Sequence, residues 1–202
     1  MLNQFSNLSC YEEFEIQSAL MGISKTDILK EIGHKIDDYY FFISNDGIFN
    51  WYDSEGNHVE DPGVLKKLHK AYIPKNIINC IVPNSVTNIG DNAFSNCKSL
   101  TSITIPTSVT SISHWAFELC ESLKEIVIPN SVINIGHGAF YRCDSLISII
   151  IPDSVISICD WVFISCESLK EVIFKGKTLE EVKQMENYPF GIEAESIIKC
   201  KM

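Results

Sequence analysis

The sequence predicts an α+β protein in which a solenoid with a curved parallel sheet of about five strands follows a small α+β N-terminal module. Two observations carry this prediction. A 23-residue unit recurs four times in strict register over residues 81–174, and residues 1–72 contain no copy of it. A fixed period of roughly 20 to 50 residues is typical of solenoids, because so short a unit buries its apolar face only against copies of itself.

The register is defined by positions that carry the same residue in all four units. A proline, a serine, a valine, an isoleucine, a phenylalanine and a cysteine each recur every 23 residues. The apolar members are predicted to point inward and to form ladders along the stack. The two most distinctive ladders are Phe94, Phe117, Phe140 and Phe163, and Cys97, Cys120, Cys143 and Cys166.

The end of each unit is predicted to be a strand, and the front half a turn or a short helical piece. Isoleucine and valine alternate at period two in the strand segment, and the proline that follows it has no N–H to continue strand pairing. Links of 23 residues between equivalent strands stack them in parallel, about 4.8 Å apart. Residues 77–82 fit the same strand pattern and add a fifth strand.

The repeated pattern IP-x-S-V-x-x-I-G-x-x-A-F-x-x-C-x-S-L resembles the BspA-type, or Treponema-type, leucine-rich repeat over residues 81–174. Ser113 and Cys159 replace the glycine of the pattern, and Val162 replaces its alanine. The resemblance implies a leucine-rich-repeat solenoid that binds rather than catalyses, since many members are bacterial or protist surface proteins tied to adhesion. The shared motif is core and turn, so it assigns no functional residue.

Residues 1–72 are predicted to form a separate module with three helices and a hairpin, which either caps the first edge of the solenoid or is the functional domain. Capping patterns place the first two helices after Ser9 and Ser24, and residues 61–69 are expected to form the third. The apolar runs YYFFIS and IFNWYD flank an Asp46-Gly47 turn, which predicts the hairpin. The residues expected to be buried on the first helix are Tyr11, Phe14, Ala19 and Leu20.

The solenoid is expected to span residues 73–174, and residues 175–202 are predicted to be a C-terminal cap. Thr178 and Glu181 form a capping-box pattern that opens a helix with Leu179 and Val182 inward. The isoleucines at 197 and 198 are expected to add a last strand.

Charge and hydropathy argue against several classes of partner. Lys and Arg number 16 against 26 Asp and Glu, a net charge of −10 without a basic stripe, which argues against a nucleic-acid partner. No apolar run reaches about 18 residues, so we expect no membrane insertion. The N-terminus has no secretory pattern, which predicts a cytoplasmic protein; a cell-surface or secreted protein is the alternative if a leader was removed.

No motif predicts an enzyme, a cofactor or a metal site. The repeated serines are explained by turns that need a hydroxyl to satisfy backbone groups. The cysteine ladder is explained by small apolar side chains buried as reduced thiols, although the spacing of neighbouring strands also permits disulfides. No Cys-x-x-Cys pair and no Cys/His spacing matches a zinc site.

Two further pairs share equivalent positions in different units. His114 and His137 lie in a row that ends in an aspartate on either side, which we interpret as a solvated edge rather than a weak metal site. Trp115 and Trp161 occupy a position held by Asn92 and Gly138 in the other units, and either pack at the turn or form a patch on the rim.

The predicted protein-binding surface is the row of residues that points outward between the inward strand positions. Most of this row is apolar although folding does not require it, and contiguous exposed apolar residues beside charged ones mark interaction sites. The alternative is a β-branched ladder that only stabilises the sheet. The row, called here the outer row, comprises Ile81, Thr104, Val127, Ile150 and Ile173, with Glu125 and Glu171 beside it.

These expectations combine into one functional hypothesis. The chain is predicted to be a non-enzymatic module that binds another protein through the concave sheet face, through the N-terminal module, or through both. A secreted or cell-surface adhesin is the alternative. The sequence does not name the partner or the oligomeric state.

Overall fold

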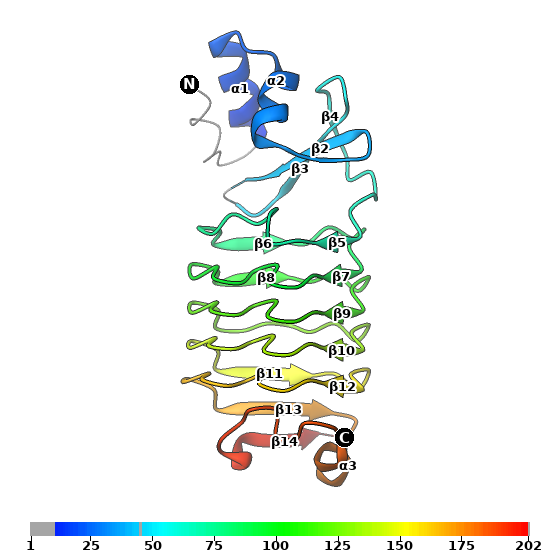
Figure 1. Ribbon diagram of the computed structural model, residues 1–202, viewed down its shortest axis with the longest axis vertical. Helices are drawn as coiled ribbons and strands as arrows, with labels where there is room; N and C mark the ends of the chain where they lie inside the picture. The colour runs from blue at the N-terminus through cyan, green and yellow to red at the C-terminus, as the bar shows by residue number, and fades with distance from the viewer. Residues whose placement is uncertain (1–10, 45, 202) are drawn as a thin grey trace.

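The computed structural model describes residues 11–44 and 46–201, and it places a helical and hairpin module at one end of a stack of solenoid turns (Figure 1). Two parallel sheets run along the stack, one formed by the ends of the repeat units and one by their front halves. The single largest apolar core fills the space inside the turns and continues into the hairpin of the module. The predicted solenoid with parallel strands is confirmed.

The first sheet contains four of the five predicted strands in the predicted register, and the strand expected over residues 123–128 is wrong. Residues 23 apart pair with one another, as Cys80 does with Ile103 and Ile149 with Val172. The last strand, expected near residue 198, pairs in parallel with the strand before it. The strands are β6 (Asn79–Ile81), β8 (Ser102–Thr104), β11 (Ser148–Ile151), β13 (Glu171–Lys175) and β14 (Ile198–Lys201).

The first sheet is interrupted at the third unit. Residues 124–128 form no strand there, and Val127 makes only an isolated parallel bridge to Ile150. The face therefore divides into a pair, β6 and β8, and a group of three, β11, β13 and β14. Composition does not explain this gap, because β13 is continuous although residues 170–171 carry the same Lys-Glu pair as residues 124–125.

The front halves of the units form a second parallel sheet of two-residue strands, where a turn or helical piece was expected. Each strand places one isoleucine or leucine inward, and all five of these side chains are buried. The strands are β5 (Lys67–Leu68), β7 (Asn88–Ile89), β9 (Ser111–Ile112), β10 (Asn134–Ile135) and β12 (Ser157–Ile158). In Figure 1 they line the side of the stack opposite the labels β6, β8 and β11.

The helix expected over residues 61–69 is wrong. The backbone there is extended, and β5 pairs with β7 as an additional rung of the second sheet. The amide of Asn88 donates to the Lys66 carbonyl (3.1 Å), and that of Gly90 donates to the Leu68 carbonyl (3.0 Å). Tertiary pairing with the first repeat unit has overridden the local helical pattern.

Three ladders of side chains hold the turns together. The rings of Phe94, Phe117, Phe140 and Phe163 stack with centroids 5.2, 5.4 and 5.9 Å apart and planes within 9° of parallel. Each ladder cysteine directs its Sγ at a carbonyl one turn back, as Cys143 does toward Phe117 (3.2 Å). Three of the four repeated serines do the same with their hydroxyls, as Ser131 does toward Val109 (2.6 Å), whereas the buried hydroxyl of Ser85 has no hydrogen-bond partner among the described residues. The three bonded serine hydroxyls therefore satisfy backbone groups, as predicted, and each of them connects two neighbouring solenoid turns.

Among its described residues, the N-terminal module contains two helices and a four-stranded antiparallel sheet. The hairpin prediction is confirmed, and Ser24 caps the second helix by accepting from the Asp27 amide (3.2 Å). The capping residue Ser9 and the side chain of Tyr11 lie outside the described residues. The elements are α1 (Tyr11–Met21), α2 (Lys25–Ile32), β1 (His34–Ile36), β2 (Tyr39–Ile43), β3 (Phe49–Tyr52) and β4 (His58–Val59).

The two faces of this hairpin are buried against different partners. Alternate side chains Phe41 and Trp51 join the solenoid core, whereas Phe42 and Tyr52 pack with the helices in a second cluster around Phe14. The burial expected of Phe14 is confirmed.

The burial expected of Ala19 and Leu20 is wrong, since both are exposed. Positions 14, 18 and 21 share the inward face at helical spacing, so positions 19 and 20 point to solvent.

The C-terminal segment closes the other end of the stack. Thr178 and Glu181 form the predicted capping box of α3 (Leu179–Gln184), and Val182 is buried as expected. Leu179 is exposed, contrary to expectation, because this six-residue helix turns only its Val182 side to the core. A short 3-10 helix (Glu195–Ile197) then leads into β14.

Candidate protein-binding surface

The outer row is exposed along most of its length. The exposed fractions are 54% for Ile81, 78% for Val127 and 42% for Ile150, and Thr104 is also exposed. Strand pairing sets Ile81 beside Thr104, and the isolated bridge sets Val127 beside Ile150. The alternation predicted for the strands therefore holds here: Ile126, next to Val127, is buried at 5% exposed.

Ile173 departs from this pattern, and its expected exposure is wrong. It is buried, at 7% exposed, because β14 pairs along β13 and sets Lys199 directly beside it. The exposed part of the outer row thus consists of Ile81, Thr104, Val127 and Ile150.

Glu125 and Glu171 border this row with exposed side chains. Neither forms an ion pair with another described residue, so both carboxylates face solvent beside the apolar row. The row is therefore an apolar strip with an acidic margin.

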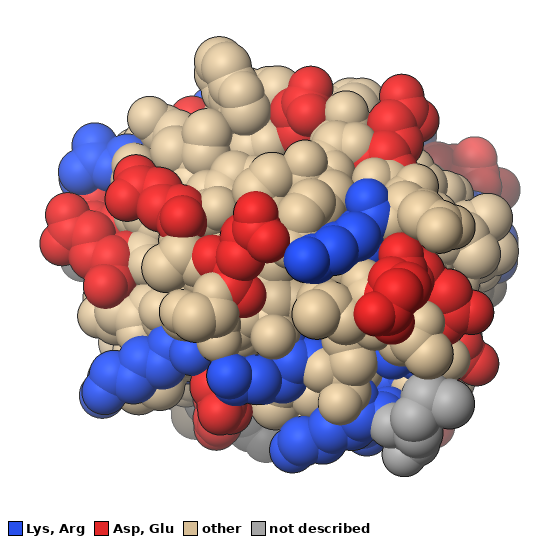
Figure 2. All heavy atoms as spheres, turned by 90° about the horizontal axis from the view of Figure 1, so that it is seen from below, with Lys and Arg blue, Asp and Glu red and all other residues tan. Residues whose placement is uncertain are grey.

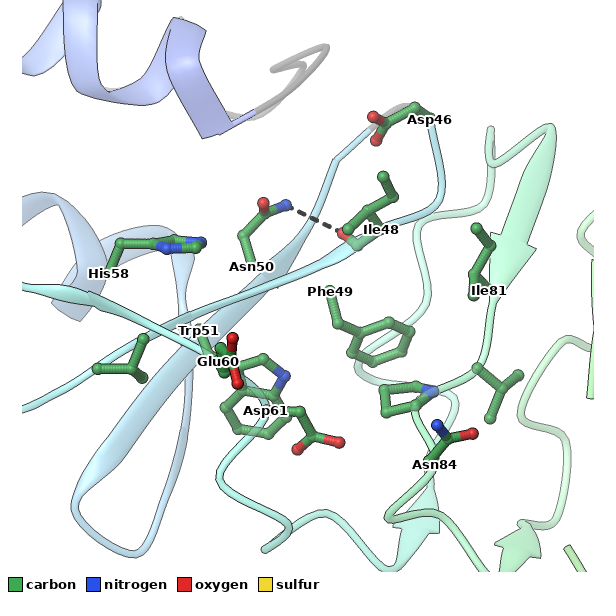
Figure 3. Close-up of a pocket in the computed structure, with 13 residues that line it drawn as sticks. Asp46, Ile48, Phe49, Asn50, Trp51, His58, Glu60, Asp61, Ile81 and Asn84 are labelled. Atoms are coloured by element: carbon green, nitrogen blue, oxygen red, sulfur yellow. Dashed lines mark hydrogen bonds between the residues drawn. The ribbon is translucent and has the colours of Figure 1, made fainter. Parts of the chain in front are cut away.

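A pocket that the sequence did not predict lies where the hairpin meets the first solenoid turn (Figure 3). Its volume is about 680 Å³, within the range of ligand and peptide sites. In Figure 3 Phe49 projects from the hairpin toward the segment that carries Ile81, with Asn84 nearby. We call this the junction pocket; its lining includes Ile48, Phe49, Trp51, Val59, Ile81 and Pro83 and the acidic Asp46, Glu60 and Asp61.

Glycine makes the close approach at this junction possible. Gly47, at φ 83°, accepts a hydrogen bond from the Ile81 amide (3.0 Å), and a methyl group on it would lie 2.1 Å from the Asn79 carbonyl oxygen. A side chain at position 47 would therefore push the hairpin away from β6. Sequence reasoning identified the Asp46-Gly47 turn as a hairpin signal, but nothing in the local pattern links it to a strand more than thirty residues later.

The histidine row lies at the edge of the turns, as predicted. The amide of His137 donates to His114 Nδ1 (2.9 Å), and the amide of His114 donates to the Asp91 carboxylate (3.2 Å). His114 Nδ1 is therefore occupied as an acceptor. In the part of the chain that the structure describes, no three His, Cys, Asp or Glu side chains come together as a metal site.

The two tryptophans pack at the turns, and one also contributes to the rim. The Trp115 ring covers Gly138 so closely that a methyl group there would lie 2.2 Å from it. Trp161 is 51% exposed, and its ring lies 6.4 Å from that of Trp115. Trp115 therefore packs at the turn, whereas Trp161 also forms part of the exposed rim, so each of the two expected arrangements is found at one of the residues.

The ladder cysteines are unreactive in chemical character. Burial raises the pKa of the Cys166 thiol to about 12 and also raises the pKa of Cys97, Cys120 and Cys143. Cys80, which lies on β6 outside this ladder, likewise has its pKa raised by burial to about 12. A thiol with a raised pKa stays protonated at neutral pH and is a poor nucleophile. The seven described cysteines are free thiols.

The charge at the far end of the stack is mixed. Figure 2 views the protein from below, and on that face several basic side chains lie along the lower edge while others lie near the centre and at the upper left, among the acidic side chains. No broad basic surface appears on this face. Among the described residues, every helix is too short or too polar to cross a bilayer.

The family model of the BspA type leucine rich repeat region matches residues 69–191 in six copies. This match covers more than half of the chain, so the protein belongs to the BspA-type leucine-rich repeat family. Comparison with curated protein sequences gives no match.

Several solved structures are similar. A leucine rich repeat protein from T. pallidum is 28% identical, with a TM-score of 0.54, over 62% of this chain and 63% of its own. A leucine rich cell surface protein from Faecalibacterium prausnitzii is 28% identical, with a TM-score of 0.52, over 77% of this chain and 42% of its own. The pneumococcal vaccine antigen PcpA, at 24% identity and a TM-score of 0.59, shares the fold over 84% of this chain and 42% of its own. The chain spans less than two thirds of the length of each of these structures.

Proposed function

We propose that this chain is a non-enzymatic module that binds another protein through the exposed part of the outer row. The observation that carries the proposal is the neighbouring exposure of Ile81, Val127 and Ile150 on a solenoid face that needs no apolar residues there to fold. Membership of a repeat family built for binding supports it. Interface energy concentrates in a few central residues, and branched apolar side chains on a rigid sheet lose little entropy when they are covered.

The N-terminal module is proposed to cap the first edge of the solenoid. The hairpin buries its Phe41 and Trp51 face against the solenoid core, and its Gly47 carbonyl accepts from the β6 amide of Ile81. Both contacts cover groups that a first rung would otherwise expose. The helices and the hairpin sheet within residues 1–72 therefore form the proposed cap, β5 belongs to the second sheet of the solenoid, and the boundary at residue 72 remains a prediction.

A cell-surface adhesin is the second candidate. The similar F. prausnitzii structure, described as a cell surface protein, supports it. The free, buried thiols instead support a reducing compartment and hence the cytoplasmic setting. Thiol titration after denaturation without reductant separates the two candidates: eight thiols agree with the cytoplasmic setting, and two or more disulfides favour the adhesin. Localisation of the native protein provides the second measurement.

The proposed surface is tested by Ile150→Glu. The new carboxylate would be buried unpaired in the interface and would sit near Glu125 and Glu171, so we expect loss of partner capture. Because Ile150 points away from the core, the folding cost should be about 1 kcal/mol, mostly lost strand propensity. The measurement is an affinity pull-down from the native host with identification of the partner by mass spectrometry, beside a thermal melt.

The matched control is Ser148→Ala, in the same strand and already small. It should bind as the parent does. If Ile150→Glu still captures the same partner, the outer row is only a sheet-stabilising ladder and the proposal fails. If Ile150→Glu unfolds the protein, the outward orientation of this row is wrong.

A further inference from the structure

We propose that Trp161, with the carboxylates of Asp160 and Glu186 beside it, binds an arginine side chain of a partner protein. This site lies at the turn that follows β12 of the second sheet, whereas the outer row belongs to the first sheet. The inference therefore goes beyond the proposed function and is tested independently of it. Three observations carry it: a tryptophan in a strained backbone position, a ring that is held in place but half open, and carboxylates without ion pairs beside it.

Trp161 occupies a backbone position that does not suit a bulky residue. Its φ is 62°, in the left-handed region, and the equivalent positions of the first and third repeat units carry Asn92 and Gly138, which adopt that region more readily. Trp115, at φ 56°, offsets the cost by covering Gly138 with its ring. Trp161 is 51% exposed, so its packing offsets less. Backbone strain that packing does not account for is typical of a functional site.

The Trp161 ring is held by two other aromatic rings. Its centroid lies 5.0 Å from that of His137 and 6.4 Å from that of Trp115, and the latter two centroids are 4.8 Å apart. These contacts restrict the indole, so it loses little entropy when a ligand covers its open part. Tryptophan attracts a cation more strongly than the other aromatic side chains do, and a planar guanidinium stacks on its ring.

Acidic side chains without ion pairs lie beside this ring. Asp160 directly precedes Trp161, and both Asp160 and Glu186 are exposed. Neither carboxylate forms an ion pair with another residue that the structure describes. Burial and, after it, the charges of these two carboxylates raise the pKa of the Cys159 thiol, which places both near the start of this turn. A carboxylate binds a guanidinium through two parallel hydrogen bonds, so the ring and the charges favour the same group.

The charge of the whole protein agrees with a cationic partner. A net charge of −10 attracts cationic surfaces and repels anionic ones such as nucleic acids. An ammonium group is more strongly hydrated than a guanidinium and has no plane to lay on an indole, which favours arginine over lysine. A second copy of this chain is a poor occupant, because its single arginine, Arg142, pairs with Asp144 (3.9 Å).

The proposal is tested by two-dimensional ¹H–¹⁵N NMR of the full chain, titrated with a capped peptide that carries three arginines separated by glycines. We expect saturable shifts of the Trp161 indole and of the amides around it, with a dissociation constant of about 1 mM or below that rises with added salt. The same peptide with citrulline in place of arginine keeps the planar group without its charge, and it should bind at least about tenfold more weakly. The lysine peptide should bind about threefold more weakly.

Two variants assign the binding to this site. Trp161→Asn removes the ring and introduces the residue type that Asn92 shows to suit this backbone position, and it should weaken binding about tenfold. Asp160→Asn removes one charge at nearly constant size and should weaken binding about threefold.

The matched controls make the same exchanges on other surfaces. Ile147, at 48% exposed, is about as open as Trp161, and Asp38 is an exposed carboxylate of the N-terminal module. Ile147→Asn and Asp38→Asn should bind the arginine peptide within about twofold of the parent. Thermal melts verify that all four variants are folded.

Loss of peptide binding in both site variants, with parent-like binding in both controls, supports the proposal. Three results overturn it: no saturable shift of the Trp161 indole up to about 5 mM peptide, equal binding of the citrulline peptide, or parent-like binding by both site variants. Tighter binding of the lysine peptide, or of a proline-rich peptide of the same length, also overturns it, because the occupant would then be an ammonium group or an apolar segment.

Discussion

The solenoid and the N-terminal module bury their aromatic side chains in different ways. In the solenoid, Phe117 stacks nearly parallel between Phe94 and Phe140, its equivalents one turn away. In the module, Phe14 meets Phe42 and Tyr52 from other elements at tilts of 45° and 57°. The solenoid core is one contact repeated, and the module core is a set of unrelated contacts.

This difference in packing determines how each region responds to a destabilising substitution. In a repeat array each turn depends on its neighbours, so a lost contact weakens the turns on both sides. The cluster around Phe14 is separate from the main core, so its loss should open the helices and leave the solenoid folded. Four predictions examine this contrast, from the largest expected effect to the smallest.

Removal of one ring from each core gives the largest effect. Phe117→Ala should cost about 4 kcal/mol of unfolding free energy, since it leaves a cavity between two stacked rings. Phe14→Ala removes a ring of equal size from the module. Hydrogen exchange should speed up across the neighbouring solenoid turns in the first variant, but only in α1, α2 and the hairpin in the second. Faster exchange throughout the solenoid in Phe14→Ala would contradict the separation of the cores.

A polar side chain in the solenoid core comes next. Ile126→Asn should cost about 3 kcal/mol, because apolar burial is lost and an amide is placed where it has no partner. Chemical denaturation provides the measurement. The neighbour Val127, exposed at 78%, supplies the control, and Val127→Asn should cost less than about 1 kcal/mol. Equal costs in the two variants would show that the inward and outward assignments at this unit are wrong.

A methyl group at two glycines separates backbone strain from crowding. Gly63 and Gly138 both have positive φ, but a methyl group on Gly63 meets nothing within 4 Å, whereas on Gly138 it would strike the Trp115 ring. Gly63→Ala should therefore cost about 1 kcal/mol and Gly138→Ala about 2 kcal/mol. In the Trp115→Ala background the additional cost at Gly138 should disappear, as a double-mutant cycle measures. An unchanged cost in that background would exclude crowding by the ring.

The smallest effect is a pH dependence in the module. Burial lowers the pKa of His34, which packs against Phe41 and Tyr72, below its usual 6.5. The unfolded chain then binds more protons than the folded one between the two pKa values, so stability rises with pH in that window. Stability should be full above pH 6.5 and should fall as pH drops through the lower folded pKa.

His34→Gln provides the control for this pH dependence. The variant should lose less stability than the parent between about pH 7 and pH 5, because one source of proton uptake is gone. Parallel stability curves for the two proteins would contradict the prediction.

The sequence by itself determined the repeat and its two faces. A period of 23 residues brings equivalent positions together, so the burial of Ile126 and the exposure of Val127 followed from the register alone. Local capping chemistry was equally readable, as at Thr178 and Glu181. The outward direction of Ile81 and Ile150 was predicted in the same way, and their role in binding stays a prediction.

Only the tertiary structure decided the contacts between segments that are not copies of the same repeat position. The rung formed by β5, the burial of Ile173 beside β14 and the pocket beneath the hairpin all depend on pieces of chain that lie outside the repeat. The physical reason is that a period specifies contacts between copies, whereas contacts between unlike segments arise from the whole fold. At both ends of the stack, the backbone groups of the exposed sheet edge need hydrogen-bond partners from another segment. The local sequence pattern does not identify the strand or turn that supplies them.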